Sequence, residues 1–210
     1  MMTLTSMLRA ASQSLIDHVD ELTALDQAIG DGDHGLNMRR GAQAINAKLP
    51  ELEGKPLSDA LKQAGMTCMS TIGGSSGPVF GTLLVTLGKE LPEQPQPTDL
   101  ARALASAIAA LTRLGKAEVG QKTLLDVLAP VQAVLADAAS NVVTGTSAGN
   151  PALVARVRAC ALESAEATAQ IPAARGRSSF LGERAMGHVD PGSRSTALII
   201  AAVCDVLAPA

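Results

Sequence analysis

Apolar residues recur every three or four positions along almost the whole chain, which is the period of an α-helix with one buried side. The first such stripe consists of Leu4, Leu8, Leu15, Val19 and Leu22. Residues 81–88, with the sequence GTLLVTLG, are the one serious competitor for a β-strand. The pattern therefore predicts an all-α protein.

Eight helices follow from this periodicity and from the positions of proline and glycine. They are predicted at residues 4–24, 35–48, 57–71, 78–90, 98–114, 121–138, 150–171 and 192–207. Short connections favour antiparallel packing of consecutive helices, so we expect an up-and-down arrangement in a single domain over residues 1–210. With 47% apolar residues but no Trp, no Tyr and two Phe, its core must consist of Leu, Ala, Val, Ile and Met.

The charge and the cysteine content argue against several classes of protein. A net charge of −3 without basic blocks argues against nucleic acid as a partner. The three cysteines are far apart, which favours reduced thiols and hence a cytoplasmic location. No signal peptide is evident in the N-terminal residues, and the longest apolar run, residues 197–204, is too short for a membrane span.

The loops fall into two kinds that alternate along the chain. Those that precede even-numbered helices carry glycine runs and most of the Asp and His residues that are candidates for a site, and they are residues 26–35, 71–78, 114–123 and 174–193. In an antiparallel arrangement these four loops meet at one end, together with the N-termini of four helices. Because unpaired N–H groups at helix N-termini attract anions, this end is predicted to be an anion site.

Asp26, Asp31 and Asp33 crowd the first of these loops. Neighbouring carboxylates repel one another unless a cation joins them, and carboxylate oxygens beside a phosphate suit Mg²⁺. An EF-hand that starts at Asp31 is excluded, because its sixth position is Leu36 rather than Gly and its twelfth is Ala42 rather than Glu. The three histidines lack the spacing of a zinc site. The alternative is that Asp33 simply caps the second helix.

The second loop contains GGSSGP at residues 73–78 and ends at Pro78, a favoured first residue of a helix. Its glycines allow backbone N–H groups to approach a phosphate, and Ser75 and Ser76 add hydroxyl groups. The segment is equally suited to a tight turn between two helices. A P-loop is excluded because no Gly-Lys pair is followed by Ser or Thr.

The fourth loop holds Arg177 and Arg184 upstream of Asp190 and Pro191. Loops of about twenty residues in compact domains are usually functional or mobile, and an arginine there can neutralise a transferring phosphoryl group. Asp190 is equally suited to cap the last helix, with Pro191 as its first residue.

Four segments taken together resemble the nucleotide-binding L subunit of bacterial dihydroxyacetone kinase. They are LTALDQAIGDGDHGLNMRRG (22–41), GMTCMSTIGGSSGPVFGT (65–82), GKAEVGQKTLLDVLAP (115–130) and GRSSFLGERAMGHVDPGSRST (176–196). They stand in order, and the resemblance covers essentially the whole chain. It implies a closed barrel of eight antiparallel helices with the nucleotide site at one end.

The resemblance also implies the ligands of that site. Asp26, Asp31 and Asp33 would bind two Mg²⁺ ions that bridge the phosphates of ADP or ATP. The nucleotide would be held by His34, Gly35, Leu36, Asn37, Ser75, Ser76, Gly115, Leu124, Arg177, Asp190, Pro191 and Gly192. Arg177 would also stabilise charge on the transferred phosphoryl group. Leu124 stands where some relatives carry Met, and another apolar residue can line a base pocket equally well.

In that family the phosphoryl group passes to dihydroxyacetone, which a separate K subunit holds covalently and for which it supplies the base. A phosphotransferase-system subunit often recharges the bound ADP. Other relatives use exchangeable ATP, act on related ketoses or tetroses, or bind a transcription regulator. We therefore expect a phosphotransferase subunit without a K domain, which forms a homodimer or a hetero-oligomer with its K subunit. An unrelated metal-dependent phosphohydrolase is the remaining alternative.

Overall fold

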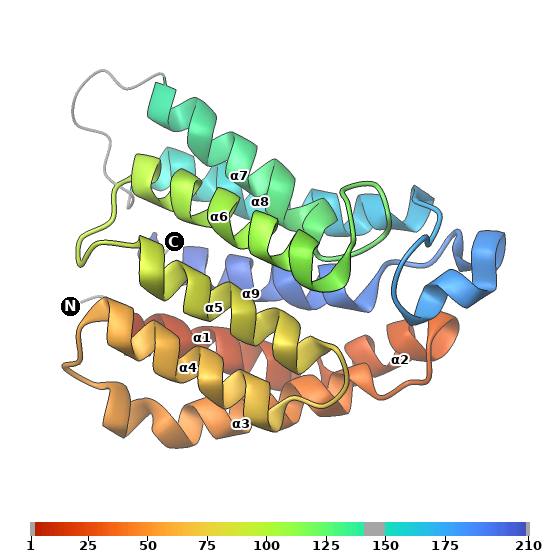
Figure 1. Cartoon of the computed structure of the whole chain (residues 1–210), viewed down its shortest axis with the longest axis horizontal. Coiled ribbons are helices and arrows are strands. Elements are labelled where there is room, and N and C mark those ends of the chain that lie inside the picture. The colour runs from red at the N-terminus through yellow and green to blue at the C-terminus, as the bar shows by residue number, and fades with distance from the viewer. Residues whose placement is uncertain (1–2, 141–149, 209–210) are drawn as a thin grey trace.

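The computed structural model describes residues 3–140 and 150–208, which form nine α-helices and two 3₁₀ helices without a β-strand (Figure 1). The α-helices are α1 (Leu4–Asp17), α2 (Val19–Ile29), α3 (His34–Leu52), α4 (Leu57–Thr71), α5 (Ser76–Glu90), α6 (Pro97–Gly115), α7 (Leu125–Ser140), α8 (Pro151–Ala167) and α9 (Pro191–Leu207). The 3₁₀ helices are η1 (Thr168–Gln170) and η2 (Arg177–Ala185). The all-α prediction is confirmed, and residues 81–88 belong to α5 rather than to a strand.

The helices pack in a circular order. Contacts run from α1 to α3, then through α4, α5, α6, α7 and α8 to α9, and α9 contacts α1 again. Such an order is the one that a closed arrangement of eight helices requires. The first turn of α1 and the last turn of α9 lie at one end of the molecule, whereas α2 and η2 lie at the other (Figure 1). Every helix among the described residues is too short or too polar to span a bilayer.

Local sequence explains where most helices begin. Thr3 and Ser6 form a capping box at α1, in which each side-chain oxygen accepts a hydrogen bond from the backbone N–H of the other residue, over 3.1–3.2 Å. Proline is the first residue of α6, α8 and α9, where its missing N–H costs no helical hydrogen bond. Asn150 caps α8 by accepting from the N–H groups of the second and third helical residues.

Four of the predicted helices have a boundary that is wrong by more than two residues. One of them is the helix expected at 150–171, which ends at Ala167, where η1 follows. The single helix expected at 4–24 is two helices, because the backbone of His18 leaves the helical region and its Nδ1 lies 2.7 Å from Ser14 O. The helix expected at 121–138 begins at Leu125, because Lys122 has a left-handed backbone (φ 62°). The helix expected to end at residue 48 runs on to Leu52, which is buried in the core.

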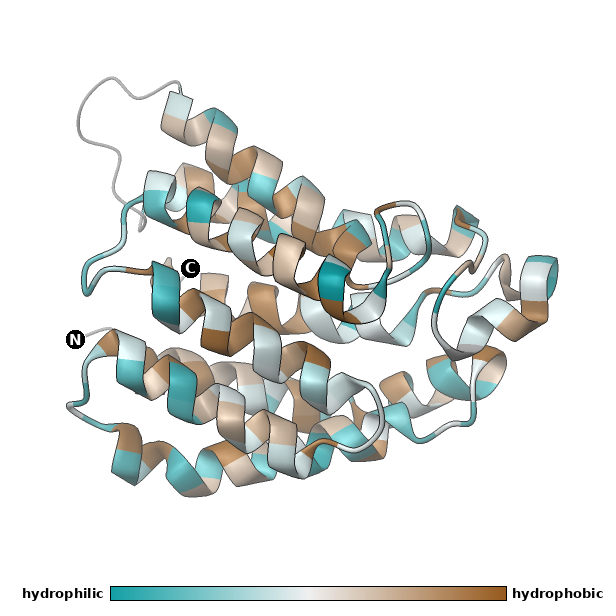
Figure 2. Cartoon of the chain, viewed as in Figure 1, coloured by the Kyte–Doolittle hydropathy of each residue, from teal (hydrophilic) through white to brown (hydrophobic). Residues whose placement is uncertain are grey.

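Two groups of buried residues form most of the core. One joins α1, α3 and α4, the other joins α6, α7 and α8, and α5 and α9 contribute to both. Figure 2 shows apolar and polar residues sharing most helices, as partly buried helices require. Helices α4 and α5 pack closely, since a Cβ atom added to Gly65 would stand 2.8 Å from Gly81 O. This close pair fixes the position of the loop between them.

Candidate functional site

The four loops singled out above meet at one end of the molecule and enclose a cavity of about 300 Å³. Eleven predicted site residues line it: Asp26, Asp33, His34, Asn37, Ser75, Ser76, Gly115, Leu124, Asp190, Pro191 and Gly192. The N-termini of α3, α5, α7 and α9 border the same cavity. Their partial positive charges therefore act on one enclosed space, which suits a bound anion.

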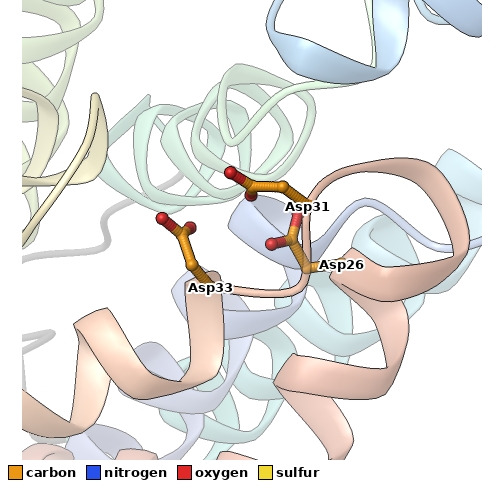
Figure 3. Close-up of side chains that lie close together, drawn as sticks. All are labelled: Asp26, Asp31 and Asp33. Carbon is orange, nitrogen blue, oxygen red and sulfur yellow. The ribbon is translucent and has the colours of Figure 1, made fainter.

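Three carboxylates, those of Asp26, Asp31 and Asp33, gather beside the cavity (Figure 3). One oxygen atom of each lies within 4.8 Å of the others. Asp26 is buried, Asp33 is half-buried and Asp31 is exposed, so that the cluster is open to solvent on one side. A Cβ atom on Gly30 would stand 2.2 Å from Asp26 Oδ1, so glycine is required there to make room for the carboxylate. The donor set and its spacing fit a hard divalent cation such as Mg²⁺.

Asp33 does not act as a simple helix cap. It stands at the N-cap position of α3, but its side chain makes no capping hydrogen bond. Asp26 takes that role instead, because its Oδ2 accepts a hydrogen bond of 3.1 Å from the N–H of His34. This bond joins the end of α2 to the start of α3 and holds the loop between them in place.

The ring of His34 is buried and is held on both sides. Nε2 lies 3.1 Å from Ser195 Oγ, and Nδ1 lies 3.3 Å from Ser76 Oγ. Because the Ser195 hydroxyl donates to Gly192 O, its oxygen accepts from Nε2–H, and Nδ1 is left to accept from the Ser76 hydroxyl. Burial lowers the pKa of His34, against the opposing effect of Asp26. The imidazole is therefore neutral near pH 7 and joins α3, α5 and α9 at the cavity wall.

The loop between α4 and α5 lies against α3. A Cβ atom on Gly73 would collide with the side-chain amide of Asn37, so a larger residue there would displace that side chain. Ser75 and the first turn of α5 follow, and their backbone N–H groups are the donors expected for a phosphate. The Ser76 hydroxyl differs from expectation, because it donates to His34 and has no second hydrogen for a phosphate.

One wall of the cavity is apolar. It consists of Val79, Phe80, Leu111, Ala117, Leu124 and Leu125. Gly115 stands beside these side chains at the end of α6. An apolar wall with a small number of polar groups beside it is typical of pockets that bind small organic ligands.

Asp190 caps α9, as one of the two interpretations of its sequence predicts. Its Oδ2 accepts from the N–H of Ser193 over 2.6 Å and from the Ser193 hydroxyl over 2.9 Å. Its own N–H donates to Thr168 Oγ1. Burial raises the pKa of Asp190 to about 6, although the bonds from Ser193 and the charge of Lys122 act in the opposite direction. The same residue lines the cavity, so capping and a site role coexist.

Some predicted residues stand elsewhere. Gly35 faces α2 rather than the cavity, since a Cβ atom there would stand 2.2 Å from Thr23 Oγ1. Leu36 is 44% exposed and is not part of the cavity wall. Arg177 is the first residue of η2, and its side chain lies outside the described residues. From this segment Arg175 lines the cavity.

Three polar residues that matter to the site are not predicted by any motif. They are Lys122, Thr168 and Ser195, and each is buried. Ser195 supports His34, Thr168 supports Asp190, and Lys122 lines the cavity. The position of Ser195 at the site could have been predicted, since it lies one helical turn after Gly192 and therefore on the same helix face.

Comparison with known protein families identifies residues 28–205 as a DAK2 domain. The chain is 36% identical over 185 residues to the ADP-binding subunit DhaL of PEP-dependent dihydroxyacetone kinase 1 from Listeria innocua, which covers 87% of this chain and 84% of that one. It is 37% identical over 176 residues to the ADP-binding subunit DhaL of the PEP-dependent dihydroxyacetone kinase from Escherichia coli, with 83% and 81% covered.

A solved structure shares the fold. The crystal structure of the dihydroxyacetone kinase of C. freundii superposes with a TM-score of 0.72 at 23% identity. The superposition covers 96% of this chain but 34% of that longer one. The same helical fold is therefore found both as most of a short chain and as about a third of a long one.

Proposed function

Because the chain belongs to the DAK2 domain family, we propose that it is the ADP-binding subunit of a cytoplasmic dihydroxyacetone kinase and that it donates the phosphoryl group. Residues 1–210 form a single nucleotide-binding domain in this proposal. A phosphotransferase-system subunit recharges the bound ADP, and the phosphoryl group passes to dihydroxyacetone that a separate K subunit holds covalently. The relatives are PEP-dependent kinases by name, which favours this source of phosphate over exchangeable ATP.

The observation that carries the proposal is that a cluster of three carboxylates and four helix N-termini share one cavity. Carboxylates alone repel a phosphate, and helix N-termini alone attract it. A divalent cation placed between the carboxylates and the phosphate allows both to lie in one cavity, because it binds carboxylate and phosphate oxygens at once. Metal-bound nucleotide is the ligand class that uses both features together.

Each group of residues then has a distinct task. Asp26, Asp31 and Asp33 hold Mg²⁺, two ions in the family's arrangement, and the bound metal supplies charge neutralisation at the phosphates. The first turn of α5 orients the phosphates through its N–H groups, and neutral His34 keeps that turn fixed to α3 and α9. The apolar wall around Leu124 takes the base. Phosphoryl transfer depends mainly on such positioning and charge stabilisation.

The base for the acceptor is assigned to the partner. Among the described cavity residues, Asp26 and Asp33 serve the cation, Asp190 caps α9, and both ring nitrogens of His34 are engaged. None of these groups is placed to deprotonate a hydroxyl. The chain supplies the donor half of a reaction whose acceptor half belongs to the K subunit.

Exposed apolar side chains around the cavity support docking of such a partner. The large hydrophobic residues exposed in the described part of the chain are Leu36, Met66, Met69, Leu114, Val119, Phe180 and Met186. All of them except Met66 lie on the loops that border the cavity or within one helical turn of those loops. Exposed apolar residues gathered in this way are typical of an interaction surface.

Single-turnover transfer tests the proposal. The chain is loaded with ATP and Mg²⁺, mixed with purified K subunit and dihydroxyacetone, and assayed for dihydroxyacetone phosphate. We expect product within one turnover, and none when either protein is left out. Absence of transfer from the loaded chain would refute the proposal. Steady phosphate release by the chain alone would instead favour a metal-dependent phosphohydrolase.

The source of the phosphoryl group is tested separately by native mass spectrometry. Copurified ADP that resists exchange supports recharging in place by a phosphotransferase-system subunit. Rapid exchange with added ATP would instead support an ATP-dependent kinase, whose acceptor is then compared between dihydroxyacetone and related ketoses or tetroses in the transfer assay.

A further inference from the structure

Lys122 is the largest fully buried side chain of the described residues, with 1% of its surface exposed. Its backbone lies in the left-handed region (φ 62°), which glycine adopts far more readily than lysine. A lysine at such a position carries the cost of both the backbone conformation and the burial of its charge. Its side chain must therefore supply compensating interactions.

Those interactions are three hydrogen bonds to backbone carbonyls. Nζ donates to Thr168 O over 2.6 Å, to His188 O over 2.6 Å and to Ile171 O over 3.3 Å. An ammonium group has three N–H donors, so all of them are used. Lys122 therefore has no donor left for a phosphate, although it lines the cavity.

The three carbonyls stand on either side of one segment, residues 172–187, which we call the arm. The arm contains η2 and contributes Arg175, Gly176 and Ser178 to the cavity wall. Thr168 and Ile171 precede it and His188 follows it. One ammonium group thus holds both ends of the arm and fixes both to the loop that precedes α7.

Other attachments of the arm are few among the described residues. Ala174 N–H donates to Gln121 O over 3.3 Å, and Gly187 N–H donates to Ala169 O over 2.8 Å. Its buried apolar contact is a small cluster in which Ala173 and Ala185 pack with Ile29 of α2. Phe180, at the middle of the arm, is 89% exposed. Among the described residues, Lys122 therefore supplies a large share of the hydrogen bonds that hold the two ends of the arm in place.

We infer that Lys122 is a positioning residue, which fixes the arm across the nucleotide cavity by tying Thr168, Ile171 and His188 together. The inference rests on the proposed nucleotide site for its functional consequence, but the attachment of the arm can be tested without any nucleotide. The carboxylates of Asp126 and Asp190 lie close enough to favour the charged form of the lysine, against the effect of burial.

Because the chain has neither Trp nor Tyr, Phe180→Trp creates a single tryptophan in the middle of the arm. In this background we compare Lys122→Met, which removes all three donors, with Lys122→Gln, which keeps two N–H donors without the charge. The matched control is Lys116→Met, since Lys116 lies in the same loop, is also left-handed (φ 50°) and is exposed. Tryptophan anisotropy and hydrogen exchange at the Gly187 amide report on the arm, and ADP titration with Mg²⁺ reports on the site.

We expect Lys122→Met to lower the anisotropy, to speed exchange at Gly187 and to weaken ADP binding by about 10- to 100-fold, as loss of a supporting residue behind a ligand commonly does. Lys122→Gln should be intermediate, and Lys116→Met should match its parent in all three measurements. Unchanged anisotropy and unchanged ADP affinity in Lys122→Met would overturn the inference. If that variant does not fold, Lys122→Gln decides by the same criteria. If the parent itself does not bind ADP, the proposed function fails, whereas anisotropy and exchange still decide whether Lys122 holds the arm.

Discussion

Asp31→Asn should remove most of the stabilisation that Mg²⁺ and ADP give to the folded protein. The oxygens of Asp31, Asp26 and Asp33 lie within 4.8 Å of one another, so that one cation can contact all three carboxylates. Two unit negative charges at about 4 Å repel by about 1 kcal/mol in water, and a cation between them offsets this repulsion.

The expected size of this stabilisation follows from a ligand that binds only the folded state. Mg²⁺ and ADP at 100 times their dissociation constant stabilise a folded protein by about 2.7 kcal/mol, which corresponds to about 5–11 °C here. Asp31→Asn should lose most of this increase, because it removes one of three charged ligands. In the presence of Mg²⁺ and ADP the variant should therefore be less stable than the wild type.

The assay is thermal unfolding followed by circular dichroism, with and without Mg²⁺ and ADP, in low and in moderate salt. Asp59→Asn is the matched control, since Asp59 is exposed in the first turn of α4, at the opposite end of the molecule. We expect this control to change Tm little and to leave the response to ligand intact. A full response of the Asp31→Asn protein to Mg²⁺ and ADP would refute the assignment of the three carboxylates.

Three further predictions concern packing, pH and the partner. Gly35→Ala should destabilise the protein by about 1–3 kcal/mol in urea unfolding, because its Cβ would collide with Thr23. Gly115→Ala, whose Cβ meets no atom closer than 4.0 Å, should be nearly neutral, and equal losses would contradict this packing. Because burial raises the pKa of Asp190 to about 6, this carboxyl loses its proton at a lower pH in the unfolded chain than in the folded protein. The free energy of unfolding should therefore fall by about 2–3 kcal/mol as pH rises from 4 to 6. Asp190→Asn keeps a capping oxygen and should remove that pH dependence. If the free energy of unfolding of this variant still falls between pH 4 and 6, Asp190 is not the group responsible. Phe180→Ala should leave ADP affinity unaltered and weaken K-subunit binding in calorimetry, and undiminished binding would exclude Phe180 from the interface.

The sequence predicts the helices well where local signals determine them. Pro151 after Asn150 marks the start of α8, and Asp190 before Pro191 marks the start of α9. The break at His18 could not be predicted in the same way, because the apolar stripe continues through it. The helix breaks there because a ring nitrogen of His18 bonds to the carbonyl of Ser14 in the preceding turn. The periodicity of apolar residues contains no information about this bond.

The candidate site likewise contains residues that the local sequence predicts and residues that it does not. Asp26, Asp31 and Asp33 lie within eight residues of one another, so the sequence alone brings them together. Ser195 meets His34 from 161 residues away, and such a contact follows from the packing of α9 on α3 rather than from any motif. Lys122 illustrates the same difficulty, because a loop lysine is ordinarily exposed.

The placement of the start of α1 and the end of α9 bears on how this fold can be combined with other domains. Helix α9 has 17 residues, so its last turn lies about 25 Å from the cavity that its first turn borders. The start of α1 lies at that same remote end (Figure 1). A tether attached there leaves the cavity mouth unobstructed, whether it leads to an affinity tag, a solid support or a further domain. The fold can thus be fused to a longer polypeptide, or operate as a detached subunit, without any change to the residues around the cavity.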